Sequence, residues 1–90
     1  MKAIITVTGK DRIGVIARVC TYLAEHSINI LDISQTIIGE GYLHMAMIVD
    51  MAASGDTFDA VAEGLDELGK QIEYVIRIQH EDIFNSMHRV

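Results

Sequence analysis

The residues best suited to chemistry in this sequence lie in one short loop, Thr8 to Gly14, directly ahead of a helical pattern. A helix that starts there presents unpaired N–H groups and a partial positive charge, which suit a carboxylate or another anion. Asp11 is expected to cap this helix by accepting from its first N–H groups. Gly9 is expected to allow a turn with a positive φ, and Gly14, in the first helical turn, leaves room for a ligand. The same pattern also fits a strand-to-helix turn that binds nothing.

Other reactive side chains do not form a catalytic or metal-binding pattern. The four histidines lack the spacing of a metal site, although His44 and His88 would meet if the C-terminal residues fold over the sheet. Cys20 shares the apolar face of the first expected helix and is expected to lie in the core. No Ser/His/Asp order, phosphate-binding loop or dinucleotide fingerprint is present. The sequence therefore predicts a protein that is not an enzyme and that needs neither a metal nor a cofactor.

Length and composition narrow the function classes further. Ninety residues predict one small domain, and the hydrophobic share of 50% predicts that some apolar surface lies in a subunit interface. The net charge is −6 and the seven basic residues are scattered, so direct binding to nucleic acid is not expected. No apolar run approaches the ~20 residues of a membrane span. A single cysteine and the absence of a signal-peptide pattern favour the cytoplasm.

Hydrophobic periodicity predicts six elements around the loop, in the order βαββαβ. This order is typical of an α+β ferredoxin-like sandwich, a four-stranded antiparallel sheet with two helices on one face. The second helix is expected to be capped by Ser54 or Asp56 and to end at Gly69. The expected elements are a strand over 2–8, a helix over 13–26, strands over 29–38 and 42–50, a helix up to 69, and a strand over 72–80.

Two features of this fold predict association. The second strand lies at a sheet edge in the expected order 4-1-3-2, so it is open to pairing with a second copy, and stacking of the open sheet faces is the alternative. Residues 81–90 form a short C-terminal amphipathic segment beyond the domain of residues 1–80. Such a segment is too short to be a stable helix alone and is expected to dock on the sheet or on a partner subunit. Its apolar side consists of Ile83, Phe84, Met87 and Val90.

Two motifs resemble those of the ACT domains. The loop Gly9 to Gly14, followed by Val15-Ile16-Ala17, resembles the DRxG signature, and Asn29-Ile30 with Asp32 resembles the opening of the second strand in that family. The resemblance covers about residues 1 to 80 in the right element order. The chain is similar to free-standing bacterial ACT-domain proteins and to the ACT domains of the glycine cleavage system repressor. Many members have proline where this chain has Ile13, which leaves the start of the helix less rigid here.

The resemblance implies a small regulatory or sensor protein that binds an amino acid or a similar small carboxylate, as a homodimer. In the family, the ligand lies between the first loop and the start of the second strand, often at a subunit interface. Backbone N–H groups near the start of the helix would hold the α-carboxylate, and a carboxylate or amide side chain would hold the α-ammonium. Carried over by position, the site residues are Asp11, Arg12, Ile13, Gly14, Asn29, Ile30 and Asp32.

Simpler roles remain open for three of these residues. Asp11 fits the part of a helix cap, Arg12 that of a solvated surface charge, and Asn29 that of a turn residue. A different function class also remains open, namely a ligand-independent interaction module that docks on a metabolic enzyme or regulator. In both cases a regulated partner would be a separate protein, because no catalytic domain is attached.

Overall fold

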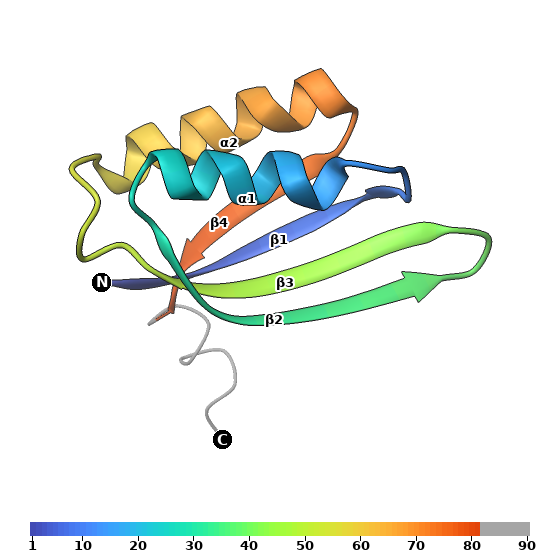
Figure 1. Ribbon diagram of the computed structural model, residues 1–90, viewed down its shortest axis with the longest axis horizontal. Helices are drawn as coiled ribbons and strands as arrows, with labels where there is room; N and C mark the ends of the chain where they lie inside the picture. The colour runs from blue at the N-terminus through green and yellow to red at the C-terminus, as the bar shows by residue number, and fades with distance from the viewer. Residues whose placement is uncertain (82–90) are drawn as a thin grey trace.

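The computed structural model describes residues 1–81 and has the order βαββαβ (Figure 1). The antiparallel strands form one sheet in the order β2-β3-β1-β4, and both helices cover the same face of it. This arrangement confirms the expected ferredoxin-like sandwich and the edge position of the second strand. The C-terminal segment and His88 lie outside the described residues. The elements are β1 (Lys2–Lys10), α1 (Val15–Glu25), β2 (Asn29–Ile38), β3 (Tyr42–Asp50), α2 (Phe58–Ile72) and β4 (Val75–His80).

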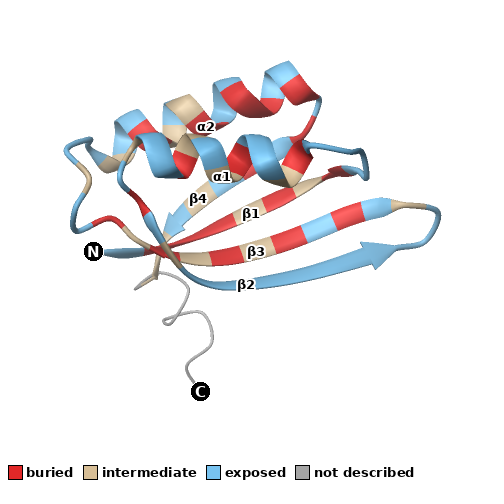
Figure 2. Cartoon of the chain, in the orientation of Figure 1, coloured by how far each residue is buried: buried red, intermediate tan, exposed pale blue. Residues whose placement is uncertain are grey.

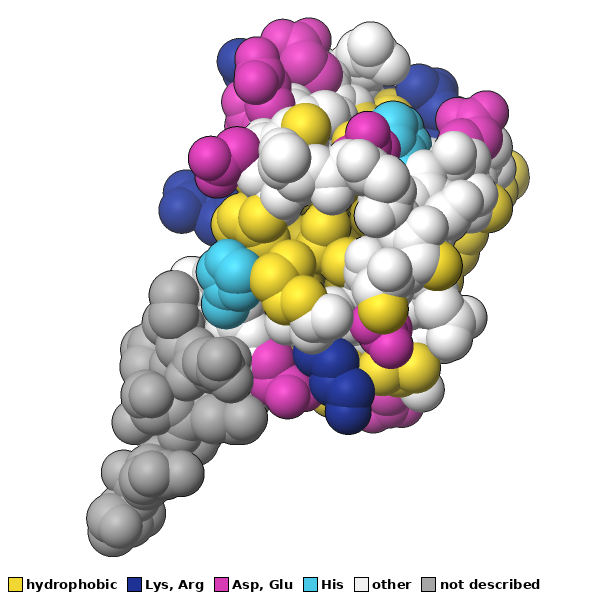
Figure 3. Space-filling view, turned by 90° about the vertical axis from the view of Figure 1, so that its left-hand side faces the viewer, with side chains coloured by type: hydrophobic (Ala, Val, Ile, Leu, Met, Phe, Trp, Pro, Cys, Tyr) yellow, Lys and Arg dark blue, Asp and Glu magenta, His cyan; other side chains and the backbone are white. Residues whose placement is uncertain are grey.

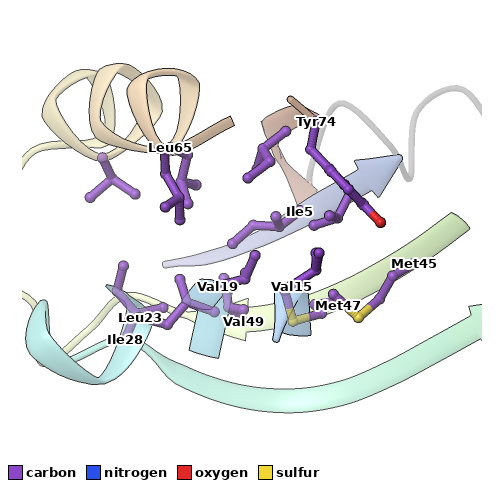
Figure 4. Packing of buried hydrophobic residues seen from close by; sticks show 14 of the residues in the cluster. Ile5, Val15, Val19, Leu23, Ile28, Met45, Met47, Val49, Leu65 and Tyr74 are labelled. Carbon is purple, nitrogen blue, oxygen red and sulfur yellow. The ribbon is translucent and has the colours of Figure 1, made fainter. Parts of the chain in front are cut away.

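The core lies between the sheet and the two helices (Figure 4). Alternation along β1 and β3 turns every second side chain toward the helices, and these side chains have no exposed surface. From the helices, α1 contributes Val15, Val19 and Leu23, and α2 contributes the stripe centred on Leu65. Cys20, expected in the core, is only half-buried. The fully buried strand residues are Ala3, Ile5, Val7, Leu43, Met45, Met47 and Val49.

The ends of α2 differ from the expected ones. Thr57 is the N-cap, and its hydroxyl accepts from the Ala60 N–H at 3.1 Å, so neither Ser54 nor Asp56 caps the helix. The helix also continues past Gly69 to Ile72 and ends at Glu73, which has a φ of 61°. Gly69 serves close packing, because a Cβ there would lie 2.6 Å from the Tyr74 carbonyl oxygen. A glycine near a helix end was therefore misinterpreted as a terminator.

Strand β2 is exposed along almost its whole length (Figure 2). Ile33 and Ile37 lie across from buried residues of β3, so they belong to the helix-covered face of the sheet. They remain 44% and 46% exposed, because the helices do not reach over the free edge of β2. Apolar side chains and unpaired backbone groups thus share one sheet edge. None of the helices in residues 1–81 has the length and apolarity needed to cross a membrane.

Candidate functional site

The turn at Gly14 sets the start of α1. Gly14 is the N-cap, with a φ of 89°, and the helix begins at Val15 rather than at Ile13. The expected cap at Asp11 is wrong, because no side chain caps this helix; the Asp11 backbone N–H instead donates to the Gly41 carbonyl at 2.7 Å. The first turn contains no acidic residue. Its first N–H groups therefore have no side-chain acceptor in the described part of the chain, as an anion-binding turn requires.

Arg12 ties this loop to the far end of α2. Its guanidinium donates to the Ile72 carbonyl and lies 3.9 Å from the Glu73 carboxylate. The same group lies 5.9 Å from the centre of the Tyr74 ring, within the range of a cation–π contact. Arg12 is therefore not a freely solvated charge. It holds the loop in position.

Tyr74 packs against the end of β1 that leads into the loop. A Cβ on Gly9 would lie 2.6 Å from the Tyr74 ring, and the Tyr74 hydroxyl donates to the Lys10 carbonyl. Gly9 lies inside β1 and does not have the expected positive φ. A larger residue at this position would overlap the Tyr74 ring. Burial raises the pKa of the Tyr74 hydroxyl, and the carboxylate of Asp11 raises it further. No local sequence signal connects Tyr74 to Gly9, so sequence reasoning missed this support.

The loop opens onto a groove of about 840 Å³ between α1 and α2. Arg12, Ile13 and Gly14 line one end of it. The side chain of Ile13 is fully exposed, and a Cβ on Gly14 would meet nothing within 4 Å. A small molecule can thus approach the backbone of the turn without displacing protein atoms.

The remaining expected site residues lie at the other end of the sheet. Asn29 pairs with Asp50, whereas Ile38, at the opposite end of β2, pairs with Tyr42 beside the loop. At about 3.3 Å per residue, Asn29 is on the order of 30 Å from that end of β2. One chain therefore does not bring Asn29, Ile30 and Asp32 to the loop that carries Asp11, Arg12, Ile13 and Gly14.

These strand residues also differ in the face that they occupy. Ile30 pairs with the buried Val49 and is half-buried at the margin of the core. A bulge follows, and Asp32 pairs with Ile48 on the open face, away from the helices. Asn29 pairs with Asp50, which also lies on the open face, so of these three residues only Ile30 lies on the helix-covered face that the loop joins.

Two histidines of the described part, His26 and His80, contact aromatic or carboxylate side chains. His26 lies 2.5 Å from a carboxylate oxygen of Asp56, and its ring stacks on Tyr22 at 4.2 Å. His80 stacks on Phe58 at 4.1 Å. Figure 3 views the molecule from the end where α2 begins and shows apolar side chains gathered there. Among residues 1–81, no three His, Cys, Asp or Glu side chains are grouped closely enough to hold a metal ion.

Comparison with known proteins agrees with this fold and loop. The ACT domain family matches residues 2–79. The chain belongs to the ACT domain family. A UPF0237 protein of Clostridium acetobutylicum is 58% identical to this ACT domain over 90 residues, which is 100% of both chains.

Two solved structures extend the comparison. An ACT domain protein from Streptococcus pneumoniae superimposes on this ACT domain with a TM-score of 0.81 and 38% identity, over 93% of each chain. A putative glycine cleavage system transcriptional repressor superimposes with a TM-score of 0.73 and 24% identity, over 87% of this chain and 44% of that one. The latter shows a shared fold, and the expected resemblance to both kinds of protein is confirmed. The chain therefore has the ACT domain fold.

Proposed function

We propose that this ACT domain is a cytoplasmic sensor that binds a free amino acid or a similar small carboxylate at the turn of Ile13 and Gly14. The ligand carboxylate accepts from the free N–H groups at the start of α1. Two observations support this: the helix has no side-chain cap or acidic first turn, and open space surrounds Gly14. Arg12 positions the turn through its contacts with the end of α2.

The site is completed by a second chain. The loop lies at the start of α1 and Asn29 lies beyond its end, so the 11 residues of this helix, about 16 Å, separate them, and they cannot share one small ligand within a chain. If β2 pairs antiparallel with β2 of a second copy, a two-fold axis brings Asn29 of that copy beside the loop of the first. The exposed edge of β2, with Ile33 and Ile37 on its helix side, supports this pairing. The separation between the loop and the start of β2 is the observation that carries the proposal.

In this arrangement the two chains share the ligand. The turn at Gly14 holds the carboxylate, and the start of β2 from the second chain lies near the ammonium group. The carboxamide oxygen of Asn29 can accept from an ammonium group. Asp11, whose side chain is exposed on the same loop, supplies the compensating negative charge.

The first experiment titrates the full chain with a panel of free amino acids by calorimetry. Ile13→Glu places a carboxylate beside the turn and should weaken binding at least about tenfold by like-charge repulsion. Ile13→Lys is the matched control, because it replaces the same exposed side chain with a cation and should not weaken binding. If the wild-type chain binds no amino acid at millimolar concentration, the sensor function is wrong.

Mixing two variants tests whether the site is shared. As homodimers, Ile13→Glu and Asn29→Ala should each bind at least about tenfold more weakly than the wild type. After the two are mixed and allowed to exchange subunits, each heterodimer has one site with an unaltered loop and an unaltered Asn29. Random exchange should restore roughly a quarter of the sites. If the mixture binds no better than either variant, the site does not combine these residues from two chains.

A second candidate function is a ligand-independent interaction module that docks on a metabolic enzyme or regulator. It is favoured by apolar side chains on the open sheet face near the β2–β3 turn. Ile38, Tyr42 and Val75 are 55%, 53% and 51% exposed there. Tyr42→Lys would weaken such docking and leave amino-acid binding unchanged, so the two functions can be separated with one variant.

A further inference from the structure

The groove between α1 and α2 extends beyond the proposed ligand site. Its lining includes three charged residues, Arg12, Arg18 and Glu25. Arg12 is already engaged with the end of α2, so Arg18 and Glu25 are the charges that remain for a partner. They stand seven residues apart on α1, two helical turns or about 10 Å, and therefore on the same side of the helix.

Contacts with α2 hold this side of α1 in place. A guanidinium nitrogen of Arg18 donates to the Gln71 side-chain oxygen at 3.2 Å, which directs Arg18 across the groove. Tyr22 crosses to α2 as well, since a Cβ on Gly64 would clash with its hydroxyl. Along the groove, Thr21 and Tyr22 thus lie between the two charged residues, Arg18 and Glu25.

We propose that this groove is a docking surface for a second copy of the chain, with α1 packed antiparallel against α1 of that copy. A two-fold axis between Thr21 and Tyr22 places Arg18 of each copy opposite Glu25 of the other. The surface is then self-complementary, as an isologous contact requires, and it forms two ion pairs. Arg18 and Glu25 lie at equal distances on either side of this axis. A second copy of the same helix therefore presents the opposite charge at each position, and for this reason we choose a second copy as the occupant.

Charge elsewhere in the helix layer favours this groove over its surroundings. The chain carries a net charge of −6, so two copies repel each other over most of their surface. On α2 the exposed acidic residues Asp59, Glu63, Asp66 and Glu67 would face their own copies in a symmetric contact. The residues that α2 contributes to the groove are uncharged: Leu68, Gln71 and Ile72.

This contact is separate from the pairing of β2. The groove is lined by the first loop and by the two helices, and no residue of β2 lines it. The helix face and the strand edge can therefore be tested independently, and neither requires an amino-acid ligand. Introducing Ile33→Lys, which places a charge on the β2 edge, isolates association through the helix face.

Sedimentation equilibrium of the full chain, with and without Ile33→Lys, tests the proposal. Arg18→Glu and Glu25→Arg should each raise the dissociation constant at least about tenfold, because each creates two like-charge contacts in the dimer. The double variant should associate like its parent, since both pairs are restored with reversed sign. An equimolar mixture of the two single variants should form heterodimers for the same reason.

Two controls separate this contact from a net-charge effect. Arg77→Glu and Glu63→Arg make the same charge changes at exposed positions outside the groove and should leave the dissociation constant unchanged. Circular dichroism confirms that each variant is folded. The proposal is overturned if the single variants associate like their parent, if the double variant stays dissociated, or if the controls act like the groove variants.

Discussion

The ring of Tyr74 occupies the space in which any side chain at position 9 would lie, and its hydroxyl donates to the carbonyl of Lys10. Tyr74 lies between α2 and β4, whereas Gly9 and Lys10 end β1. The loop with the candidate site is thus supported by the last third of the chain. Arg12 reinforces this link by bonding to Ile72. A ligand that moves the loop would therefore strain the junction of α2 and β4.

Gly9→Ala should destabilise the fold by displacing the Tyr74 ring. An added Cβ would lie 2.6 Å from a ring carbon, and overpacking of this kind costs about 1–3 kcal/mol. Urea denaturation monitored by circular dichroism measures the loss. Gly55→Ala is the matched control, because a Cβ there meets nothing within 4 Å, and its free energy of unfolding should stay the same or rise slightly. Equal effects of the two substitutions would contradict the packing role of Gly9.

Tyr74→Phe should lower the free energy of unfolding by about 0.5–1.5 kcal/mol at neutral pH, because the Lys10 carbonyl loses its donor. Burial raises the pKa of Tyr74 above its ordinary 10.0, so the folded state favours the neutral hydroxyl. The stabilisation is complete below pH 10 and is lost as the pH rises through the raised value. The difference between wild type and variant should therefore shrink above pH 10 in denaturation series. A constant difference would show that Tyr74 does not ionise differently in the two states.

The sequence predicted the order and faces of the elements well, because alternation and helical periodicity are local signals. The bounds of β2 and β3 were confirmed, and the inward residues of β3 are completely buried. The helix ends were predicted less well. Ser54, Asp56 and Thr57 all suit a cap, and only the tertiary path of the chain selects Thr57. Similarly, glycines at positions 9 and 69 suggested turns but serve close contacts with Tyr74.

Thr57→Ala should destabilise α2 by about 1 kcal/mol, because the Ala60 N–H loses its side-chain acceptor. Ser54→Ala is the matched control. Its hydroxyl accepts from the Asp56 N–H ahead of the helix, so its removal should cost less. Thermal denaturation of both variants beside the wild type gives the comparison. A greater loss for Ser54→Ala would mean that the helix is capped from position 54 instead.

The candidate site could be predicted from sequence only in part. The loop and the start of β2 were identified from motifs, yet motifs do not report distance. The register of β2 on β3 places Asn29 and the loop at opposite ends of the sheet. The roles of Arg12 and Asp11 also depend on partners far along the chain, Ile72 and Gly41, which no local pattern indicates. Long-range pairing was the missing information in each case.

The free edge of β2 leads to the last prediction. Ile33 is 44% exposed on the helix side of this edge, where a second copy would cover it. Ile33→Lys should prevent β2 from pairing with β2 of a second copy, because pairing would bury the charged lysine at the strand edge. In the absence of the second strand, the same lysine remains in solvent, so the fold of the single chain should be preserved.

Light scattering at micromolar concentrations measures the change in mass, and calorimetry measures amino-acid binding on the same samples. Val75→Lys is the matched control, since Val75 is 51% exposed on β4 at the opposite edge of the sheet. We expect Ile33→Lys to lose both the β2 contact and at least about tenfold in ligand affinity, because each site then lacks the Asn29 of the second chain. Val75→Lys should keep both. If Ile33→Lys binds the amino acid like the wild type, the ligand needs only one chain and the strand-paired site is wrong.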